Sequence, residues 1–316
     1  MSDMPLGPAP RWVGAAASII QRLPAGRYRA MNWVAARGAD PFWARMPADL
    51  GGALFRCDLR DPLMREVCLT GRYEPQETTL LQQLLEPGMT CVDVGANWGY
   101  FALVAAHLVG PDGRVVAVEA DPRACRTLRA NAARNHLDHI SVVEAAASDR
   151  PGTIGLQAYG HGADDLSNFG LTSTTTIIAG GSRFEVAARP LDAVLDQVGI
   201  ERVDVLKMDI EGAEARALAG LERRLSASAI DRIVLELHPA HLRDQGSSVD
   251  AVVSLLRGHG YAAWRIDHSP DAYRWAAQMR GGRETPASLL APYRDGDHLG
   301  EWPHLLWTRT GLEPRA

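Results

Sequence analysis

The sequence predicts an α/β fold with a mostly parallel, doubly wound sheet of about seven strands and a helical N-terminal extension. From about residue 71, short runs rich in β-branched residues alternate with segments whose apolar residues recur at helical spacing. A glycine-rich turn follows the first of these runs. Strands that alternate with helices form parallel sheets, because each helix returns the chain to the edge where the previous strand began.

The expected strands are short apolar runs bounded by turn residues, as is typical of strands buried on both faces. They are Thr90–Ala96, Arg114–Glu119, Ile140–Ala147, Val203–Met208, Arg232–Leu237, Tyr261–Ile266 and His304–Arg309.

The expected helices lie between these strands. One covers Tyr100–Val109 and stops at a Gly-Pro-Asp-Gly turn, and the next places Ala124, Leu128 and Ala132 on one face. Two more are marked by apolar residues at helical spacing, namely Ala217, Leu218, Leu221 and Leu225, and then Val249, Val252, Val253 and Leu256.

Three segments interrupt this alternation. Residues 1–70 are expected to form a helical cap, and residues 71–316 the α/β domain. Residues 157–183 and 267–303 are long and irregular, which is typical of lids over a binding site.

Composition excludes several classes of protein. Hydrophobic residues make up 46% and charged residues 22%, as in ordinary globular chains. A net charge of −5 argues against a dedicated nucleic-acid binder. No apolar run is long enough to span a bilayer and the start does not resemble a secretory signal. Four widely spaced cysteines without a C-x-x-C pair fit a reducing compartment, so we expect a cytoplasmic protein.

The N-terminal segment has an unusual charge pattern. No acidic residue occurs between Asp3 and Asp40, whereas five arginines and two tryptophans fall within residues 11–37. Such a segment can be a cap whose arginines are merely solvated, or it can contact an anionic membrane surface or polyanion. We expect the cap with solvated arginines, because basic helix faces are common, and contact with a membrane surface stays an alternative.

The strongest chemical signal is the turn at residues 93–99 (DVGANWG) between the first strand and its helix. Glycines at such a turn allow close approach of a ligand and expose N–H groups of the first helical turn. Glu119 ends the next strand, 20 residues beyond Gly99, at the register where a carboxylate binds a ribose diol. Together these features predict a nucleoside ligand.

The glycine spacing distinguishes two nucleoside ligands. Dinucleotide sites have G-x-G-x-x-G, whereas Gly95 and Gly99 are spaced G-x-x-x-G, and Asp93 precedes them. NAD would place an anionic pyrophosphate at this turn. S-adenosylmethionine instead carries a sulfonium and an amino-acid tail, which suit an acidic neighbour better.

With these residues the sequence resembles the FkbM family of S-adenosylmethionine-dependent methyltransferases, from about Gly71 to Pro239. The motifs that carry the resemblance are residues 71–75 (GRYEP), 92–100 (VDVGANWGY), 118–122 (VEADP), Asn131, Asn135, 206–214 (LKMDIEGAE) and 235–239 (LELHP). The resemblance implies a Rossmann-like class I methyltransferase fold. It also implies O-methylation of a hydroxyl on a secondary metabolite, sugar or glycolipid, with S-adenosylhomocysteine as the second product.

The resemblance implies a set of donor-binding residues. Asp93, Gly95, Asn97 and Gly99 would hold the methionine end of the donor, and Glu119 its ribose. Two further residues are expected at this site: Glu74 near the donor amino group, and Asp149 at the adenine. Asp149 precedes Arg-Pro-Gly and could equally be a turn residue.

The acceptor side is expected at the carboxyl ends of the fourth and fifth strands, where Asp209 and His238 stand. Either could be the base that takes the proton of the acceptor hydroxyl. Asp209 could instead cap the following helix, and His238 could be a turn residue before Pro239. Lys207 should share a strand face with Asp209 and could position its carboxylate.

The sequence also allows other interpretations of the cofactor and the function. Mg²⁺ could bind Asp209 with Glu236 or His238, although metal-free transfer is favoured. An NAD-dependent oxidoreductase and a non-catalytic nucleoside-binding protein are alternatives on the same kind of sheet. The expected acceptor is a small molecule or glycan and not a nucleic acid. The oligomeric state is open, and a homodimer is compatible with the sequence.

Overall fold

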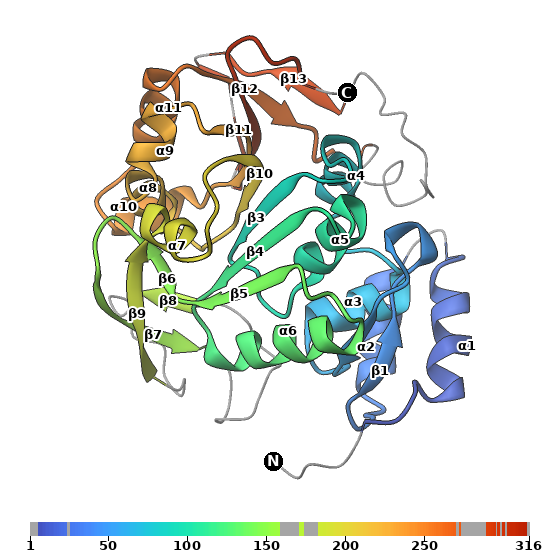
Figure 1. Ribbon diagram of the computed structural model, residues 1–316. Coiled ribbons are helices and arrows are strands. Elements are labelled where there is room, and N and C mark those ends of the chain that lie inside the picture. Colours follow the sequence, from blue (N-terminus) through green and yellow to red (C-terminus); the bar gives the residue numbers. More distant parts are fainter. Residues whose placement is uncertain are drawn as a thin grey trace.

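A computed structural model describes residues 6–23, 26–158, 171–173, 183–269, 272, 289–294, 296–297, 299–300 and 302–314. Its centre is a sheet with the strand order β13-β12-β14-β11-β10-β3-β4-β5 (Figure 1). These strands are β3 (Thr90–Val94), β4 (Arg114–Glu119), β5 (Ile140–Glu144), β10 (Val203–Met208), β11 (Ile230–Glu236), β12 (Tyr261–Ile266), β13 (Leu290–Pro292) and β14 (His304–Arg309).

The pairing of the strands confirms the mostly parallel sheet. The strands from β11 through β10, β3 and β4 to β5 are parallel neighbours, whereas β14 runs antiparallel to both β11 and β12. An eighth strand, β13, lies within the stretch expected to be irregular and pairs with β12. The order of parallel strands reverses between β3 and β10, so their carboxyl ends are where a ligand is expected.

Helices cover both faces of this sheet, as a doubly wound fold requires (Figure 1). Side chains of β4 alternate between two hydrophobic clusters, with Val115 and Ala117 in one and Val116 and Val118 in the other. The helices are α4 (Pro75–Leu84), α5 (Tyr100–Val109), α6 (Pro122–Arg134), α7 (Leu191–Gln197), α8 (Glu214–Ala219), α9 (Glu222–Ser226), α10 (Pro239–Asp244) and α11 (Val249–Gly258). The Rossmann-like α/β fold is thereby confirmed.

The expected strand over residues 140–147 is wrong in its second half. The chain leaves the main sheet after Glu144, and β6 (Ala146–Ser148) pairs in parallel with β9 (Arg183–Pro190). These strands form a second sheet of order β6-β9-β7-β8 with β7 (Gly152–Ala158) and β8 (Leu171–Ser173). An alanine run fits either sheet, so its composition could not show the break.

Most of both expected lids lies outside the described residues. The parts of 157–183 that are described belong to β7, β8 and β9. Within 267–303, the described parts include β13.

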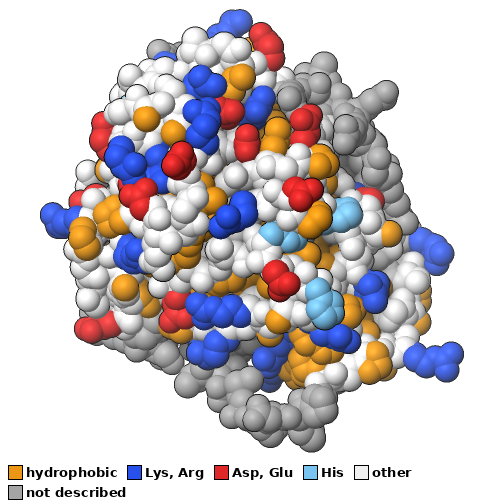
Figure 2. Space-filling model, viewed as in Figure 1, with side chains coloured by type: hydrophobic (Ala, Val, Ile, Leu, Met, Phe, Trp, Pro, Cys, Tyr) orange, Lys and Arg blue, Asp and Glu red, His pale blue; other side chains and the backbone are white. Residues whose placement is uncertain are grey.

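The N-terminal segment is helical as expected, but it also contains a hairpin. Its elements are α1 (Arg11–Ile20), α2 (Arg27–Ala35), β1 (Phe42–Arg45), the short helix η1 (Ala48–Leu50), β2 (Leu54–Cys57) and α3 (Pro62–Thr70). Among the helices of the described residues, none is long and apolar enough to cross a membrane. Acidic and basic side chains are interspersed over much of the face in Figure 2, in keeping with the small net charge.

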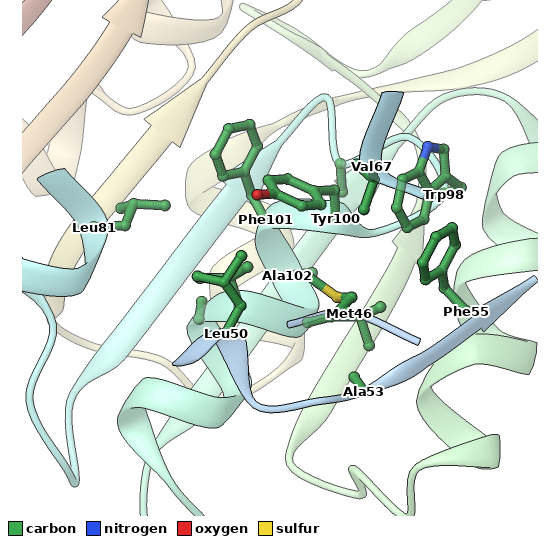
Figure 3. Packing of buried hydrophobic residues seen from close by; sticks show 14 of the residues in the cluster. Met46, Leu50, Ala53, Phe55, Val67, Leu81, Trp98, Tyr100, Phe101 and Ala102 are labelled. Carbon is green, nitrogen blue, oxygen red and sulfur yellow. The ribbon is translucent and has the colours of Figure 1, made fainter. Parts of the chain in front are cut away.

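The hairpin packs against the helix that follows the glycine turn (Figure 3). The rings of Phe55 and Trp98 stack with centroids 5.0 Å apart. Asn131 of α6 accepts a hydrogen bond from the Arg56 N–H at 2.8 Å and donates to the Trp98 carbonyl oxygen at 2.9 Å. One hydrophobic cluster therefore contains residues from both sides of position 70, and Asn131 joins the hairpin to the turn.

Candidate active site

The glycine turn lies against the end of β10. Gly95 and Gly99 have φ values of 82° and 98°, which are accessible to glycine at little cost. A Cβ at position 95 would lie 1.9 Å from the Asp209 carbonyl oxygen, and one at position 99 would lie 2.1 Å from Leu128 Cδ1. Both positions therefore require glycine.

Glu119 holds this turn in place. Its Oε2 accepts a hydrogen bond from the Asn97 N–H at 2.8 Å, and its Oε1 accepts one from the Asp121 N–H at 2.7 Å. Its side chain is buried, and burial raises the pKa of Glu119 to about 7 even though these hydrogen bonds oppose the shift. The carboxyl group is thus fixed at the end of β4, with remaining lone pairs for a ligand.

A cavity opens at the carboxyl ends of β3, β4 and β10. Four residues predicted from the sequence line it, namely Gly95, Asn97, Glu119 and Asp209. Its wall also includes Tyr73, Phe101, Val118, Asp121, Ile154, Leu156, Lys207, Glu211 and Arg216. The structure therefore brings the glycine turn, the predicted ribose carboxylate and one predicted catalytic residue to a single hollow.

Three non-glycine residues near this edge have left-handed backbone conformations. Glu74, Asn97 and Glu211 have φ values of 38°, 51° and 52°. Such conformations are costly for residues with a side chain and concentrate at functional sites. Glu74 caps α4, and its buried Oε2 has no hydrogen-bond partner in the described structure.

Asp93 lies behind the turn rather than in the described wall of the cavity. It is 1% exposed and stands opposite Lys207 in the pairing of β3 with β10. Burial raises the pKa of Asp93 to about 6, and the Lys207 ammonium opposes that shift. Both carboxylate oxygens of Asp93 are buried without a hydrogen-bond partner in the described structure, and direct contact with a donor stays a prediction.

Asp149 lies outside the described wall of the cavity. It is exposed beyond the end of β6, and its Oδ1 accepts a hydrogen bond from the Ser148 hydroxyl at 3.1 Å. This hydrogen bond to the adjacent residue is compatible with the turn role, and contact with adenine stays a prediction.

Lys207 is buried among acidic side chains. Its Nζ lies 3.8 Å from Asp209 Oδ2 and 4.3 Å from the centroid of the Phe101 ring. Although burial opposes its charge, the carboxylates of Asp209, Glu74 and Asp93 raise the pKa of Lys207 above its ordinary value. The only lysine of the chain is thus a fixed cation that orients Asp209.

His238 lies among carboxyl groups at the end of β11. Its Nδ1 is 2.9 Å from Glu214 Oε1, and its Nε2 lies 3.5 Å from Glu211, 3.6 Å from Glu236 and 3.9 Å from Asp209. Burial lowers the pKa of His238, but the Glu214 hydrogen bond and the other carboxylates raise it more. The neighbouring carboxylates therefore favour the protonated imidazole, which leaves less of the neutral form that could accept a proton.

A second cluster at the same edge was not found from the sequence. His268 Nε2 and His304 Nδ1 lie 2.6 and 2.8 Å from Glu77 Oε1, and the two rings stack at 3.8 Å. Glu236 Oε1 is 3.6 Å from His304 Nε2 and joins this cluster to His238. His268 lies within the irregular stretch 267–303, His304 directly follows it and Glu77 lies in α4, so no local motif marks the set.

Two sets of three side chains within the described ranges bring possible metal-ligand atoms within 4.8 Å of one another. One is Asp209, Glu236 and His238, which contains the pair considered for Mg²⁺. The other is Glu77, His268 and His304. In the first set, burial and the carboxylates of Asp209 and Glu74 raise the pKa of Glu236 to about 10, so this carboxyl group is protonated at neutral pH unless a cation displaces the proton.

A family model matches more than half of this chain. The Methyltransferase FkbM domain model matches residues 93–263, which contain the glycine turn, Glu119, Asp209 and His238. The chain belongs to the FkbM methyltransferase family. The resemblance seen in the motifs is thus confirmed, and the protein is an S-adenosylmethionine-dependent methyltransferase with a class I methyltransferase fold.

Two FkbM relatives carry descriptive names. The 31-O-demethyl-FK506 methyltransferase FkbM of Streptomyces tacrolimicus is 32% identical over 200 residues, covering 56% of this chain and 74% of the relative. The 2-O-methyltransferase NoeI of Sinorhizobium fredii is 27% identical, with the same coverage of 56% and 74%. Among solved structures, Aeropyrum pernix fibrillarin with bound S-adenosyl-L-methionine has 13% identity and a TM-score of 0.40, covering 73% of each chain.

Proposed function

We propose that this FkbM methyltransferase transfers the methyl group of S-adenosylmethionine to a hydroxyl of a small molecule, such as a secondary metabolite, a sugar or a glycolipid. The observation that carries the proposal is the single cavity shared by the glycine turn, Glu119 and Asp209. NoeI is a 2-O-methyltransferase by name, and the name of the Streptomyces relative gives a 31-O-demethyl compound; both names support oxygen as the acceptor atom.

The cavity has suitable groups for this donor. Gly95 permits close approach to the backbone, and Glu119 offers carboxylate lone pairs for the ribose hydroxyls. Glu211 in the same wall provides an acidic group for the cationic methionine end. Glu74 and Asp93 lie behind this wall and would act on the donor through Lys207 and the turn.

Asp209 is the better placed of the two predicted bases. Methyl transfer requires the acceptor oxygen in line with the sulfur–methyl bond, so that the oxygen–carbon bond forms as the carbon–sulfur bond breaks and its electron pair returns to sulfur. Asp209 Oδ1 or Oδ2 would accept the hydroxyl proton and pass it to water. His238, stabilised as a cation, would position the carboxylates around it rather than remove a proton.

The charges around Asp209 support the proposal that transfer is metal-free. Lys207 Nζ lies 3.8 Å from this carboxylate, and His238 Nε2 lies 3.9 Å from it. Positive charge on these two side chains would stabilise the Asp209 carboxylate, so the proposed step includes no Mg²⁺. Equal rates with added Mg²⁺ and with a chelator are expected, and a rate that depends on Mg²⁺ would return Asp209 and Glu236 to a metal-binding role.

The proposal is tested by incubating the purified protein with methyl-labelled S-adenosylmethionine and a panel of hydroxylated and amine-bearing small molecules. We expect label in a hydroxyl-bearing product and S-adenosylhomocysteine in equal amount. Mass spectrometry and nuclear magnetic resonance then identify the methylated atom. Transfer of the label only to nitrogen would confirm methyltransferase activity but contradict the proposal that the acceptor is a hydroxyl.

A further inference from the structure

The exposed hydrophobic side chains of this protein gather on its first two helices. Among the described residues, the large hydrophobic side chains that are exposed are Trp12, Ile19, Tyr28, Trp33 and Trp302. All but Trp302 belong to α1 or α2, and Ile19, Tyr28 and Trp33 are each more than 60% exposed. Isolated exposed apolar residues are common, but such a concentration on two short helices marks an interaction surface.

The helices expose these side chains on their outer faces. Trp12 and Ile19 are seven residues apart, about two helical turns, and therefore lie on one side of α1. Val13 and Ile20, each one residue further along and so about 100° around the helix, are buried in the main hydrophobic cluster. In α2, Met31 and Val34 are buried in the same cluster while Tyr28 and Trp33 remain outside.

The same surface is basic. Arg11, Arg22, Arg29 and Arg37 are exposed within residues 11–37, where the sequence has no acidic residue, although the whole chain has a net charge of −5. The Arg37 guanidinium lies 3.2 Å from the centroid of the Trp33 ring.

We propose that the outer faces of α1 and α2 bind the surface of a membrane that contains anionic lipids. Tryptophan and tyrosine favour the boundary between headgroups and acyl chains, and an isoleucine beside them can enter the apolar layer. The arginines would pair with lipid phosphates, which matches the positive charge of this surface. A nucleic acid would satisfy the arginines but would leave Ile19 without an apolar partner, so lipid fits both features.

The test uses the full chain and vesicles of phosphatidylcholine, with and without a quarter of phosphatidylglycerol, in a co-sedimentation assay. We expect the protein to bind the anionic vesicles at least tenfold more strongly than the neutral ones, and added salt to weaken that binding. Inorganic phosphate at 10 mM, about its concentration in common buffers, should compete little because it offers no apolar layer.

Matched variants separate the apolar and the charged contributions. The double substitution Ile19→Ser with Trp33→Ser and the double substitution Arg22→Gln with Arg29→Gln should each lower binding to anionic vesicles at least tenfold. Trp302→Ser is the control, since Trp302 is 65% exposed like Trp33 but lies outside these helices. The affinity of each variant for S-adenosylhomocysteine shows that it is folded.

Several outcomes would overturn the proposal. These are absence of binding to anionic vesicles, unchanged binding by the Ile19→Ser and Trp33→Ser variant, or equal loss with Trp302→Ser. Binding that only the arginine substitutions weaken, and that phosphate abolishes, would indicate a phosphate site and not a membrane surface. Tighter binding to double-stranded DNA than to anionic vesicles would assign the surface to nucleic acid instead.

Discussion

Gly95 and Asp209 directly follow the neighbouring strands β3 and β10, and their backbones approach so closely that a Cβ on Gly95 would lie 1.9 Å from the Asp209 carbonyl oxygen. The Asp209 N–H also donates to the Val94 carbonyl oxygen at 3.0 Å. The glycine turn and the predicted base are thus fixed relative to each other by backbone contacts at the reversal of strand order. The geometry of donor and base is therefore set by the sheet itself.

Gly95→Ala should damage both folding and donor binding. Alanine would have to adopt a left-handed conformation, which costs about 1–3 kcal/mol of stability. Its Cβ would also overlap the backbone after β10, which costs about 1–3 kcal/mol more. Gly88→Ala is the matched control, because Gly88 also has a positive φ, 86°, but open space around its missing Cβ. Chemical denaturation should show a clearly larger loss for Gly95→Ala, and equal losses would mean that the close approach to Asp209 carries no cost.

Glu119→Ala should lower donor affinity by at least about tenfold, because it removes the predicted ribose contact and leaves the N–H groups of Asn97 and Asp121 without their acceptor. Glu144→Ala is the control, since Glu144 ends the neighbouring strand in register with Glu119 but is exposed. Calorimetric titration with S-adenosylhomocysteine measures both. Unchanged affinity in Glu119→Ala would remove this residue from the donor site.

Asp209→Asn should lower the rate of methyl transfer by about 100-fold or more, as expected for loss of a general base, with a much smaller change in donor affinity. Asp250→Asn in the exposed first turn of α11 should change neither. The rate is measured at saturating donor. If donor affinity falls as far as the rate does, Asp209 binds the donor instead of acting on the acceptor.

Glu74→Gln should stabilise the protein at high pH. Burial raises the pKa of Glu74 from 4.5 to about 8, and the Lys207 ammonium opposes this shift. The contribution of the neutral Glu74 side chain to the stability of the wild type is therefore complete below pH 4.5 and is lost as the pH rises from 4.5 to 8. Glutamine does not ionise, so the variant avoids this loss. Thermal unfolding should show no difference near pH 4 and a gain on the order of 4 kcal/mol near pH 8. A gain of the same size at both values would indicate a cause other than ionisation.

Elements whose bounds are marked by residues next to them in the sequence could be predicted. β4 and α5 have the predicted bounds, because their apolar runs are flanked by clear turn residues. The split between β5 and β6 was missed, since Ala145 and its neighbours fit either sheet and the decision lies in pairing with β9, distant in the chain. The N-terminal hairpin was missed for a similar reason, because its polar contacts come from Asn131 and Asn135.

Some residues of the candidate site could likewise be predicted from the sequence and others could not. Gly95, Asn97 and Glu119 could be predicted because strand, turn and acid follow one another at a fixed spacing. The cluster of Glu77, His268 and His304 could not, since it forms only when α4 meets the edge of β12 and β14. The cationic character of His238 was also beyond the sequence, because it depends on carboxylates gathered from separate segments.

The most direct test of the central claim is calorimetric titration of the purified protein with S-adenosylmethionine, S-adenosylhomocysteine and NAD⁺ in parallel. The cavity formed by the glycine turn, Glu119 and Asp209 predicts binding of the first two ligands, with micromolar dissociation constants on the order of those typical for small-molecule substrates, and none of NAD⁺. Binding of NAD⁺ alone would contradict the account and assign Glu119 to a dinucleotide site.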